Sequence, residues 1–275
     1  MRARYPERIV CLTEETTETL YLLGEERRIV GVSGYTVRPP EARRDKPKVS
    51  AFLSAKTDKI LALEPDLVLG FSDLQADIAR ELAKAGLNVV LFNQRSIDEI
   101  LSMILMLASM VGAADKGRKL VEELETNLRQ IEQAGQKLSK RPRVYFEEWD
   151  EPMISAIRWV SELIEIAGGE DVFSSISFSK GASGRTIADP REVVQRAPDV
   201  ILGSWCGKKF RPERVAARPG WGAIPAVRDG ALYEIKSSEI LQPGPAALTD
   251  GVRRIHDILR AASRRRPRTH QSGAS

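Results

Sequence analysis

The chain has 275 residues, 42% of them hydrophobic, which suits one large domain or two of ordinary size. The basic excess behind its formal net charge of +4 lies in the arginine-rich tail after Arg260, so the body lacks the electrostatic footprint of a nucleic-acid-binding protein. Two cysteines far apart in sequence and only two histidines exclude a disulfide framework, a CxxC metal site and a histidine-rich metal centre.

The amino-terminal segment MRARYPERIVCL lacks the apolar run of a secretory signal. Nor does any stretch of the chain approach the 18 uninterrupted apolar residues that suggest a membrane span. We therefore expect a cytoplasmic protein without a transmembrane segment, or a periplasmic or cell-surface protein if the start site is misassigned.

Short apolar runs alternate with helix-forming segments through the first part of the chain. The expected strands are 8–13, 28–33, 48–50, 66–70 and 88–93, and the expected helices are 16–23, 58–63, 73–85 and 96–111. Because this alternation is typical of parallel sheets covered by helices, residues 1–114 are predicted to form an α/β lobe.

A long, charged segment from Asp115 to Leu138 contains no proline and is rich in strong helix formers. Its apolar residues mostly recur at steps of three and four, which predicts a narrow apolar stripe on a helix of roughly 36 Å. We interpret residues 115–140 as a rigid linker helix between two lobes. The alternative is an ordinary surface helix of one larger domain.

The strand and helix pattern restarts after this segment. Strands are expected at 143–146, 199–203 and 231–235, and helices at 159–167, 190–196 and 246–259. DKILALEPDLVLG, starting at Asp58, resembles REVVQRAPDVILG, starting at Arg191, which favours two related lobes. The fold class is thus α/β, with Rossmann-like lobes at 1–114 and 141–262 and a basic disordered tail at 263–275.

Sequence motifs of catalysis are missing: the chain has no P-loop, nucleophile elbow, dinucleotide fingerprint or zinc-protease helix. Glu147 and Glu148 end a predicted strand and, with Cys206, would be the candidates in an enzyme. Adjacent strand residues point in opposite directions, and a solvated loop is favoured for at least one of the two acids. We therefore expect a non-enzymatic protein with no catalytic residue, no metal site and no required cofactor.

Aromatic residues follow the predicted core strands. Phe71, Trp149 and Trp205 each come just past the carboxyl end of a strand, and Tyr35 and Phe52 lie in loops that lead to the same edge of the first sheet. Open parallel sheets bind ligands at this edge, and large apolar walls suit a sizeable organic ligand. The alternative is that some of these side chains only fill lobe cores.

Polar residues of the second lobe complete the candidate site. Arg185 lies in a glycine-containing loop, and Glu239 and Gln242 precede Pro243-Gly244-Pro245. Each would by default face solvent, and each is a candidate ligand contact. Trp221, before the last strand, is assigned to packing.

Six segments carry a family resemblance that spans about residues 7–262: RIVCLTEETTETLYLLG, GVSGYTVRPP, KILALEPDLVLG, SELIEIAGGEDVF, EVVQRAPDVIL and PGWGAIPAVRDGALYEI. In this order the chain resembles the class III solute-binding proteins of ABC importers, whose lobes are joined by one helix, and is closest to their vitamin B12-binding members. The resemblance implies a corrinoid such as cobalamin as the small-molecule ligand, bound in a cleft between lobes.

The ligand-contact positions that the resemblance implies are the first point at which this chain departs from the family. Tyr35, Phe52 and Phe71 match aromatic positions, with phenylalanine replacing tryptophan at the last two. Arg185 stands where the family has a tryptophan, so it would face a carboxylate, amide or phosphate group of the ligand, and Trp149 or Trp205 would supply the missing aromatic surface.

Docking on an ABC permease is the second point of departure. Family members usually present one acid from each lobe to permease arginines; Asp58 keeps this charge and Arg191 reverses it. The reversal implies weakened docking, so we expect a corrinoid-binding protein without a conventional exported importer role. The alternatives are a ferric siderophore, haem or another metal chelate as the ligand for ABC uptake, and an enzyme or partner protein that uses the same fold.

Overall fold

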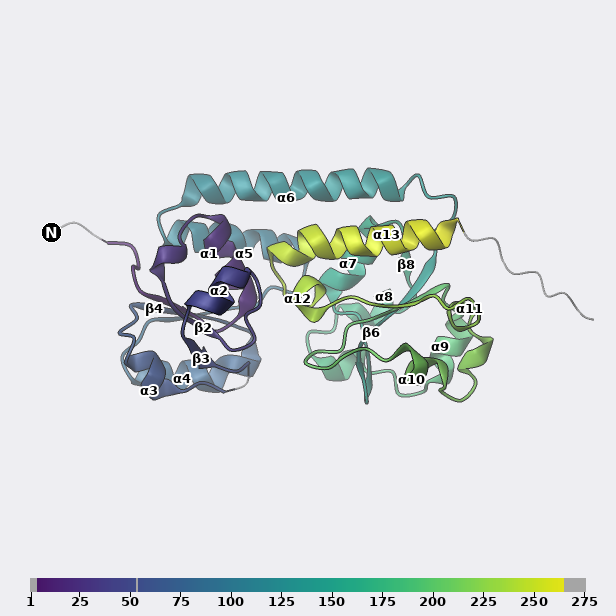
Figure 1. The fold of residues 1–275 in the computed structure, drawn as a ribbon, viewed down its shortest axis with the longest axis horizontal. Helices are drawn as coiled ribbons and strands as arrows, with labels where there is room; N and C mark the ends of the chain where they lie inside the picture. Colours follow the sequence, from purple (N-terminus) through teal and green to yellow (C-terminus); the bar gives the residue numbers. More distant parts are fainter. Residues whose placement is uncertain (1–3, 53, 265–275) are drawn as a thin grey trace, which may run out of the picture. The chain divides into compact units, whose positions relative to one another are not determined.

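The computed structural model describes residues 4–52 and 54–264, which form two compact units (Figure 1). Unit 1 consists of Met1–Asn127 and Gln242–Thr249, and unit 2 of Leu128–Leu241 and Asp250–Ser275. Of the tail predicted at 263–275, the part from residue 265 onward lies outside the described residues.

Unit 1 is built on a parallel sheet with the strand order β3-β2-β1-β4-β5. Its strands are β1 (Ile9–Cys11), β2 (Ile29–Ser33), β3 (Lys48–Ser50), β4 (Leu67–Phe71) and β5 (Val89–Phe92). Its helices are α1 (Glu14–Leu22), α2 (Pro40–Asp45), α3 (Thr57–Leu61), α4 (Ala76–Lys84) and α5 (Ile97–Met110), with 3₁₀ turns η1 (Glu26–Arg28) and η2 (Asp73–Gln75). All five carboxyl ends therefore share one edge, where ligands of open parallel sheets bind.

Buried aliphatic side chains explain this sheet. Val10, Leu12 and Val68 are inaccessible to solvent and pack in one cluster with residues of the neighbouring helices. Helix α5 begins where the sequence predicts: Ser96 accepts from the Glu99 backbone, and the Glu99 carboxylate accepts from the Ser96 backbone, forming a capping box. Helix α2, at the end of a predicted loop, was not expected.

Helix α6 (Ala114–Gly135) corresponds to the predicted linker. Its 22 residues span about 33 Å, and it ends at Gly135, five residues before the predicted end of the linker at residue 140. Val121, Leu124 and Leu128 lie on one stripe and are all less than 10% exposed. The chain passes from unit 1 into unit 2 within this helix, so one long helix joins the two lobes.

Unit 2 contains a sheet of order β10-β9-β6-β7, with β8 beside the start of β6. Its strands are β6 (Arg143–Asp150), β7 (Met153–Ser155), β8 (Glu170–Asp171), β9 (Val200–Gly203) and β10 (Leu232–Glu234). β6, β8, β9 and β10 pair in parallel, whereas β7 returns antiparallel to β6. The hairpin that β7 forms was not predicted, because three residues after Pro152 carry too little pattern.

Short helices surround this second sheet. They are α7 (Arg158–Ile166), α8 (Ser174–Ser177), α9 (Arg191–Arg196), α10 (Pro212–Ala216), α11 (Pro225–Arg228), α12 (Ser237–Ile240) and α13 (Val252–Ser263), with 3₁₀ turns η3 (Ala182–Arg185) and η4 (Trp221–Ala223). A π-helical turn, η5 (Ala247–Gly251), precedes α13, so the predicted helix 246–259 is a turn followed by a helix that ends later.

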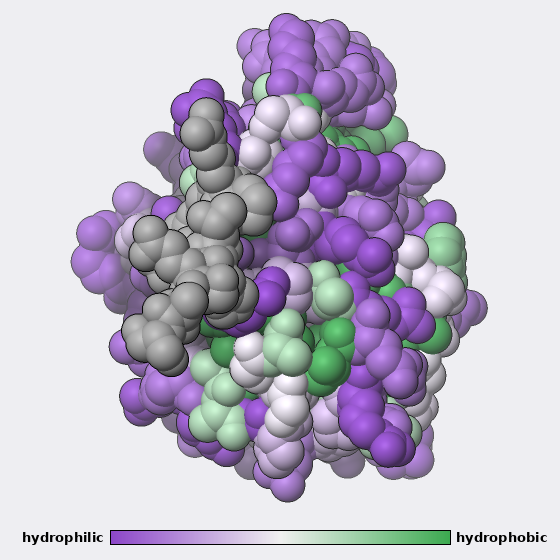
Figure 2. All heavy atoms as spheres, turned by 90° about the vertical axis from the view of Figure 1, so that its right-hand side faces the viewer, coloured by the Kyte–Doolittle hydropathy of each residue, from purple (hydrophilic) through white to green (hydrophobic). Residues whose placement is uncertain are grey.

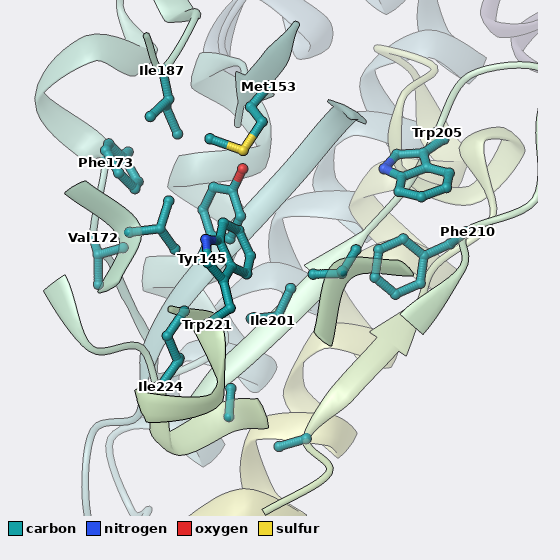
Figure 3. Packing of buried hydrophobic residues seen from close by; sticks show 14 residues of the cluster. Tyr145, Met153, Val172, Phe173, Ile187, Ile201, Trp205, Phe210, Trp221 and Ile224 are labelled. Atoms are coloured by element: carbon teal, nitrogen blue, oxygen red, sulfur yellow. The ribbon is translucent and has the colours of Figure 1, made fainter. Parts of the chain in front are cut away.

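Aromatic rings hold the core of unit 2 (Figure 3). Tyr145 packs edge-on against Phe173 and Trp221, with ring centroids 5.6 and 6.0 Å apart. Trp221 is fully buried, which confirms its assignment to packing. At the end of β9, a Cβ on Gly203 would lie 1.9 Å from the Phe210 ring, so this position requires glycine.

The face drawn in Figure 2 is mainly hydrophilic, with the largest group of hydrophobic side chains below its centre and smaller groups elsewhere. Within the described residues, no helix has both the length and the apolar character needed to cross a membrane.

Candidate functional site

A β-bulge shapes the carboxyl end of β6. Glu147 pairs with Ser155 of β7, but the next paired residue on β6 is Trp149, opposite Ile154, so Glu148 is the extra residue. Bulges re-aim side chains and are frequent next to functional sites. Glu147, Glu148 and Asp150 all lie on β6, so the predicted solvated loop at Glu147 or Glu148 is wrong. Each of these three carboxylates has its own basic partner.

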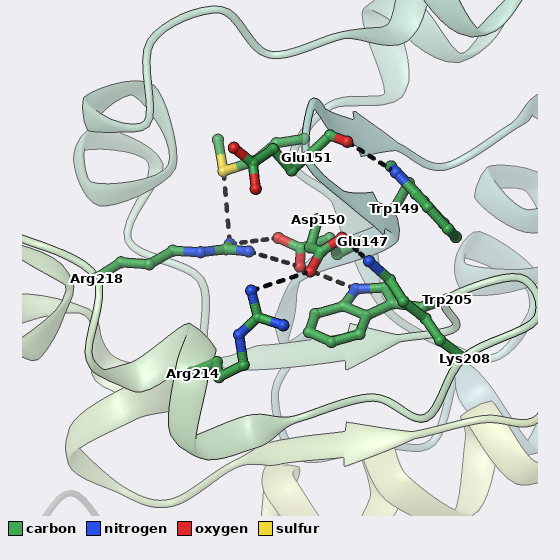
Figure 4. A network of polar contacts seen from close by, with 9 residues as sticks. Glu147, Trp149, Asp150, Glu151, Trp205, Lys208, Arg214 and Arg218 are labelled. Carbon is green, nitrogen blue, oxygen red and sulfur yellow. Dashed lines mark hydrogen bonds and ion pairs between the residues drawn. The ribbon is translucent and has the colours of Figure 1, made fainter.

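Glu147 is the buried centre of a polar network (Figure 4). Its carboxylate, 0% exposed, accepts hydrogen bonds from Tyr145 Oη at 2.9 Å, Trp205 Nε1 at 3.1 Å and Arg218 Nη2 at 3.0 Å. Arg218 Nη1 also donates to it, which makes the ion pair bidentate. Burial, and then the adjacent Glu147 charge, raise the pKa of Tyr145 well above its ordinary value. Glu147 therefore fixes the positions of Trp205 and Arg218.

Asp150 forms a second cluster at the end of the strand (Figure 4). Its side chain is 5% exposed, bonds Lys208 Nζ and lies 3.7 Å from Arg214 Nη2. Burial alone would raise the pKa of Asp150, but the hydrogen bond and charge of Lys208 hold it below its ordinary value. The Lys208 ammonium also lies 4.0 Å from the centre of the Trp149 ring and 5.1 Å from that of Trp205.

Arg185 binds the third acid of this strand end. Its Nη1 and Nη2 donate to the two oxygens of Glu148 at 2.5 and 3.1 Å, and Nη1 also donates to the Ser155 carbonyl. The guanidinium is 3% exposed. The expectation that Arg185 faces a carboxylate, amide or phosphate group of a ligand stays a prediction. Within the protein its guanidinium pairs with Glu148, the extra residue of the bulge.

An open cavity of about 480 Å³ lies beside these clusters in unit 2. Aromatic, aliphatic, proline and charged side chains line it: Asp150, Glu151, Pro152, Met153, Thr186, Ile187, Ala188, Pro190, Trp205, Arg214, Arg218 and Pro219. Trp205, although 3% exposed and part of the core cluster, supplies one wall. Trp149, half-buried on β6, stands beside it across Lys208. The two predicted aromatic residues are thus brought together.

The predicted aromatic residues of unit 1 differ in exposure. Tyr35 is 59% exposed in the loop after β2, Phe52 is half-buried after β3, and Phe71 is 8% exposed at the end of β4. Gln75, which the sequence did not indicate, ties two of them together: its Oε1 accepts from the Phe71 backbone and its Nε2 donates to the Phe52 carbonyl, both at 2.9 Å. The Arg95 guanidinium stacks 4.6 Å from the Phe71 ring centre.

Two acids at the start of α1 were also missed. Glu14 and Glu15 lie three and four residues after the end of β1 and are 6% and 1% exposed. Burial raises the pKa of each to about 7, although Glu14 accepts from the Val37 and Arg38 backbones and Glu15 accepts from the Thr13 hydroxyl. Acids in a first helical turn are common on surfaces, so the sequence gave no sign of burial.

Four further predicted residues occupy scattered positions. Glu239 is half-buried on α12, and Gln242 is half-buried at the start of the segment Gln242–Thr249 that belongs to unit 1. Asp58 is exposed on α3, and Arg191 is exposed at the first residue of α9. No pair among these four is joined by a hydrogen bond or ion pair that the structure records, so their roles stay predictions.

Among the described residues, no cluster of three or more His, Cys, Asp or Glu side chains is arranged to hold a metal ion. The carboxylates that gather at β6 are instead matched to guanidinium and ammonium groups. A site of this composition can bind a ligand by stacking and hydrogen bonding.

Residues 9–239 match the family described as "Periplasmic binding protein", and the chain belongs to this family. It is 25% identical over 263 residues to an uncharacterized ABC transporter substrate-binding lipoprotein of Bacillus subtilis, covering 92% of this chain and 80% of that protein. It is 28% identical over 249 residues to the vitamin B12-binding protein of Vibrio campbellii, covering 86% and 84%. A periplasmic heme-binding protein of Pseudomonas aeruginosa has a similar fold, with a TM-score of 0.77, 20% identity and 93% of each chain covered.

These comparisons confirm the predicted family and fold, including the connecting helix. They give no support to the expectation of a cytoplasmic protein, because the matched family and the relatives' names indicate the periplasm or a lipoprotein. The missing signal motif in the amino-terminal segment is weak evidence of location. The alternative prediction, a periplasmic or cell-surface protein, agrees with these relatives.

Proposed function

We propose that the protein binds a corrinoid such as cobalamin, without altering it chemically, as the solute of an ABC importer in the periplasm or at the cell surface. The similarity to vitamin B12-binding proteins over most of the chain supports this ligand class. The candidate ligand contacts are the aromatic side chains at the carboxyl edge of the sheet, taken separately in each unit. No cofactor is required.

The observation that carries the proposal is the charge balance at the end of β6. Four carboxylates stand beside four cationic groups: Glu147, Glu148, Asp150 and Glu151, with Arg185, Lys208, Arg214 and Arg218. A corrin macrocycle has a broad apolar surface and a periphery of neutral amide groups, which both donate and accept hydrogen bonds. A polar site without surplus charge suits such a ligand better than a strongly anionic one.

Accessible aromatic side chains provide the stacking surface. Tyr35 presents more than half of its surface to solvent, and Trp149 and Phe52 are half-buried. Each unit also holds one of the predicted aromatic side chains more deeply packed, Phe71 in unit 1 and Trp205 in unit 2. Aromatic rings bind large apolar ligands well because each buries a large area at little cost in side-chain entropy.

Docking on a permease would use the exposed positions on α3 and α9. Asp58 retains an exposed carboxylate. Arg191 is bound by Asp189, whose Oδ1 and Oδ2 lie 3.0 and 2.9 Å from its Nε. This local pair reduces the positive charge that a permease arginine would meet, so the reversal at Arg191 weakens docking without abolishing it.

The test is the absorbance spectrum of the purified protein after mixing with hydroxocobalamin, dicyanocobinamide or haem and desalting, followed by titration calorimetry. A corrin spectrum that stays with the protein, unchanged after prolonged incubation, supports the proposal. Release of both corrinoids by correctly folded protein refutes it.

A second candidate ligand is an anionic metal chelate, such as haem or a ferric siderophore. Arg214 favours it, because this guanidinium lines the cavity and is 63% exposed, although it lies 3.7 Å from Asp150 and 5.9 Å from the centre of the Trp205 ring. Retention of haem or of a ferric siderophore with release of cobalamin would decide for this class.

A further inference from the structure

Lys208 occupies an unusual position for a surface lysine. Its ammonium group is shared by the Asp150 carboxylate and the faces of two tryptophans, at 4.0 Å for Trp149 and 5.1 Å for Trp205 (Figure 4). An ammonium ion over an indole face is the strongest common cation–π geometry, and a carboxylate on its other side adds a charge-assisted hydrogen bond.

The loop that carries Lys208 is fixed at both ends. At one end, Trp205 bonds to Glu147. At the other, the Phe210 backbone donates to Glu234 Oε1 at 2.9 Å, and the Phe210 ring packs edge-on against Trp205 with centroids 5.1 Å apart. Between them, Gly207 has a φ of +78° and turns the chain so that Lys208 reaches back across the tryptophans.

Trp149 is the more exposed ring of the pair, although it also packs against the core cluster of unit 2. Its indole Nε1 donates to the Glu151 carbonyl at 2.8 Å, and the ring is half-buried at the strand end. Trp205 is 3% exposed within this cluster and donates its indole hydrogen bond to Glu147. The contact with Lys208 therefore joins the partly exposed ring of Trp149 to the buried ring of Trp205.

We propose that Lys208 is a positioning residue that holds Trp149 beside Trp205, so that the two rings form one ordered wall for the ligand. The inference rests on the proposed function of binding a large, flat ligand. It assigns to Lys208 the role of contacting both indole rings at once through its ammonium group. Ordering the wall in advance reduces the entropy lost when the ligand binds.

The matched variants are Lys208→Ala, Lys208→Arg and Lys209→Ala. Arginine keeps the charge and stacks on indole, whereas alanine removes both. Lys209 is the exposed neighbour in the same loop and has no recorded contact with either tryptophan. Circular dichroism and thermal melting establish first that each variant is folded.

The first readout needs no ligand: quenching of tryptophan fluorescence by acrylamide. All four tryptophans are described, and Trp149 alone among them is more than slightly exposed. Lys208→Ala should raise the quenching constant about twofold, with Lys208→Arg and Lys209→Ala close to the unchanged protein. Equal quenching in Lys208→Ala and the unchanged protein would overturn the proposal.

The second readout is the dissociation constant for dicyanocobinamide. Lys208→Ala should weaken binding about tenfold and Lys208→Arg much less. Unaltered affinity of Lys208→Ala, with binding by the unchanged protein intact, overturns the positioning role alone. If the unchanged protein binds no corrinoid, the proposed function fails, and the quenching result still decides whether Lys208 orders Trp149.

Discussion

Replacing Glu15 by glutamine should stabilise the protein at alkaline pH and hardly at all at acidic pH. Burial raises the pKa of Glu15 from an ordinary 4.5 to about 7, and the Thr13 hydroxyl, which donates to Oε1, lowers it only in part. Gly244 packs against its side chain. The nearby Glu14 and Glu18 carboxylates also oppose ionisation.

The sign follows from proton binding. The folded protein holds a proton on Glu15 up to about pH 7, whereas the unfolded chain releases it near 4.5, so folding stability falls as pH rises through this window. A difference of about 2.5 pKa units corresponds to roughly 3 kcal/mol at pH 8, at about 1.4 kcal/mol per unit. Glutamine keeps the shape and the acceptor for Thr13 but has no charge to desolvate.

The assay is urea denaturation followed by circular dichroism at pH 5, 6, 7 and 8, with hydrogen exchange of α1 to localise the effect in unit 1. The stabilisation by Glu15→Gln should grow across this series and level off above pH 7. Glu122→Gln, a change of the same kind at an exposed position of α6, is the control and should show no trend. A gain that is equal at pH 5 and pH 8 would refute the reasoning.

Three further changes test the site. Glu147→Gln should cost about 3–5 kcal/mol in the free energy of unfolding, measured by tryptophan fluorescence in urea, because it leaves the partly buried Arg218 without its counter-charge; a loss below 1 kcal/mol would contradict this. Tyr35→Ala should weaken corrinoid binding about tenfold in calorimetry with an unchanged melting temperature, since the ring is exposed; unchanged affinity would remove Tyr35 from the site. Arg191→Glu should strengthen binding to a B12-type permease up to about fivefold in a kinetic binding assay, and no gain would exclude charge reversal as the obstacle to docking.

Local patterns in the sequence were sufficient for most of the fold. The buried strands β1, β4 and β9 are continuous apolar runs, and the apolar residues of α6 recur with the helical period over about six turns. These elements could therefore be predicted from their own residues alone. Failures occurred where the signal is short or ambiguous. β7 has only three residues, and the π-helical turn before α13 keeps a helical composition although its backbone is wider.

The site was less predictable because its essential contacts are distant in sequence. Glu147 and Arg218 are 71 residues apart, and Glu148 and Arg185 are 37 apart. A pattern of adjacent acids at a strand end gives no indication of these partners. The bulge at Glu148 is equally hidden, because an extra residue is recognised only by the register of the neighbouring strand.

The pairing of these charges bears on specificity as well as on stability. An unpaired arginine at the cavity would attract any anion, whereas Arg218 offers only the hydrogen-bonding capacity that Glu147 leaves over, and Arg185 is closed to solvent by Glu148. The carboxylates are likewise screened from metal cations by their basic partners. Around Arg185 and Arg218 the site can therefore select shape and the placement of neutral donors and acceptors, whereas the exposed Arg214 is the group that an anionic ligand would meet.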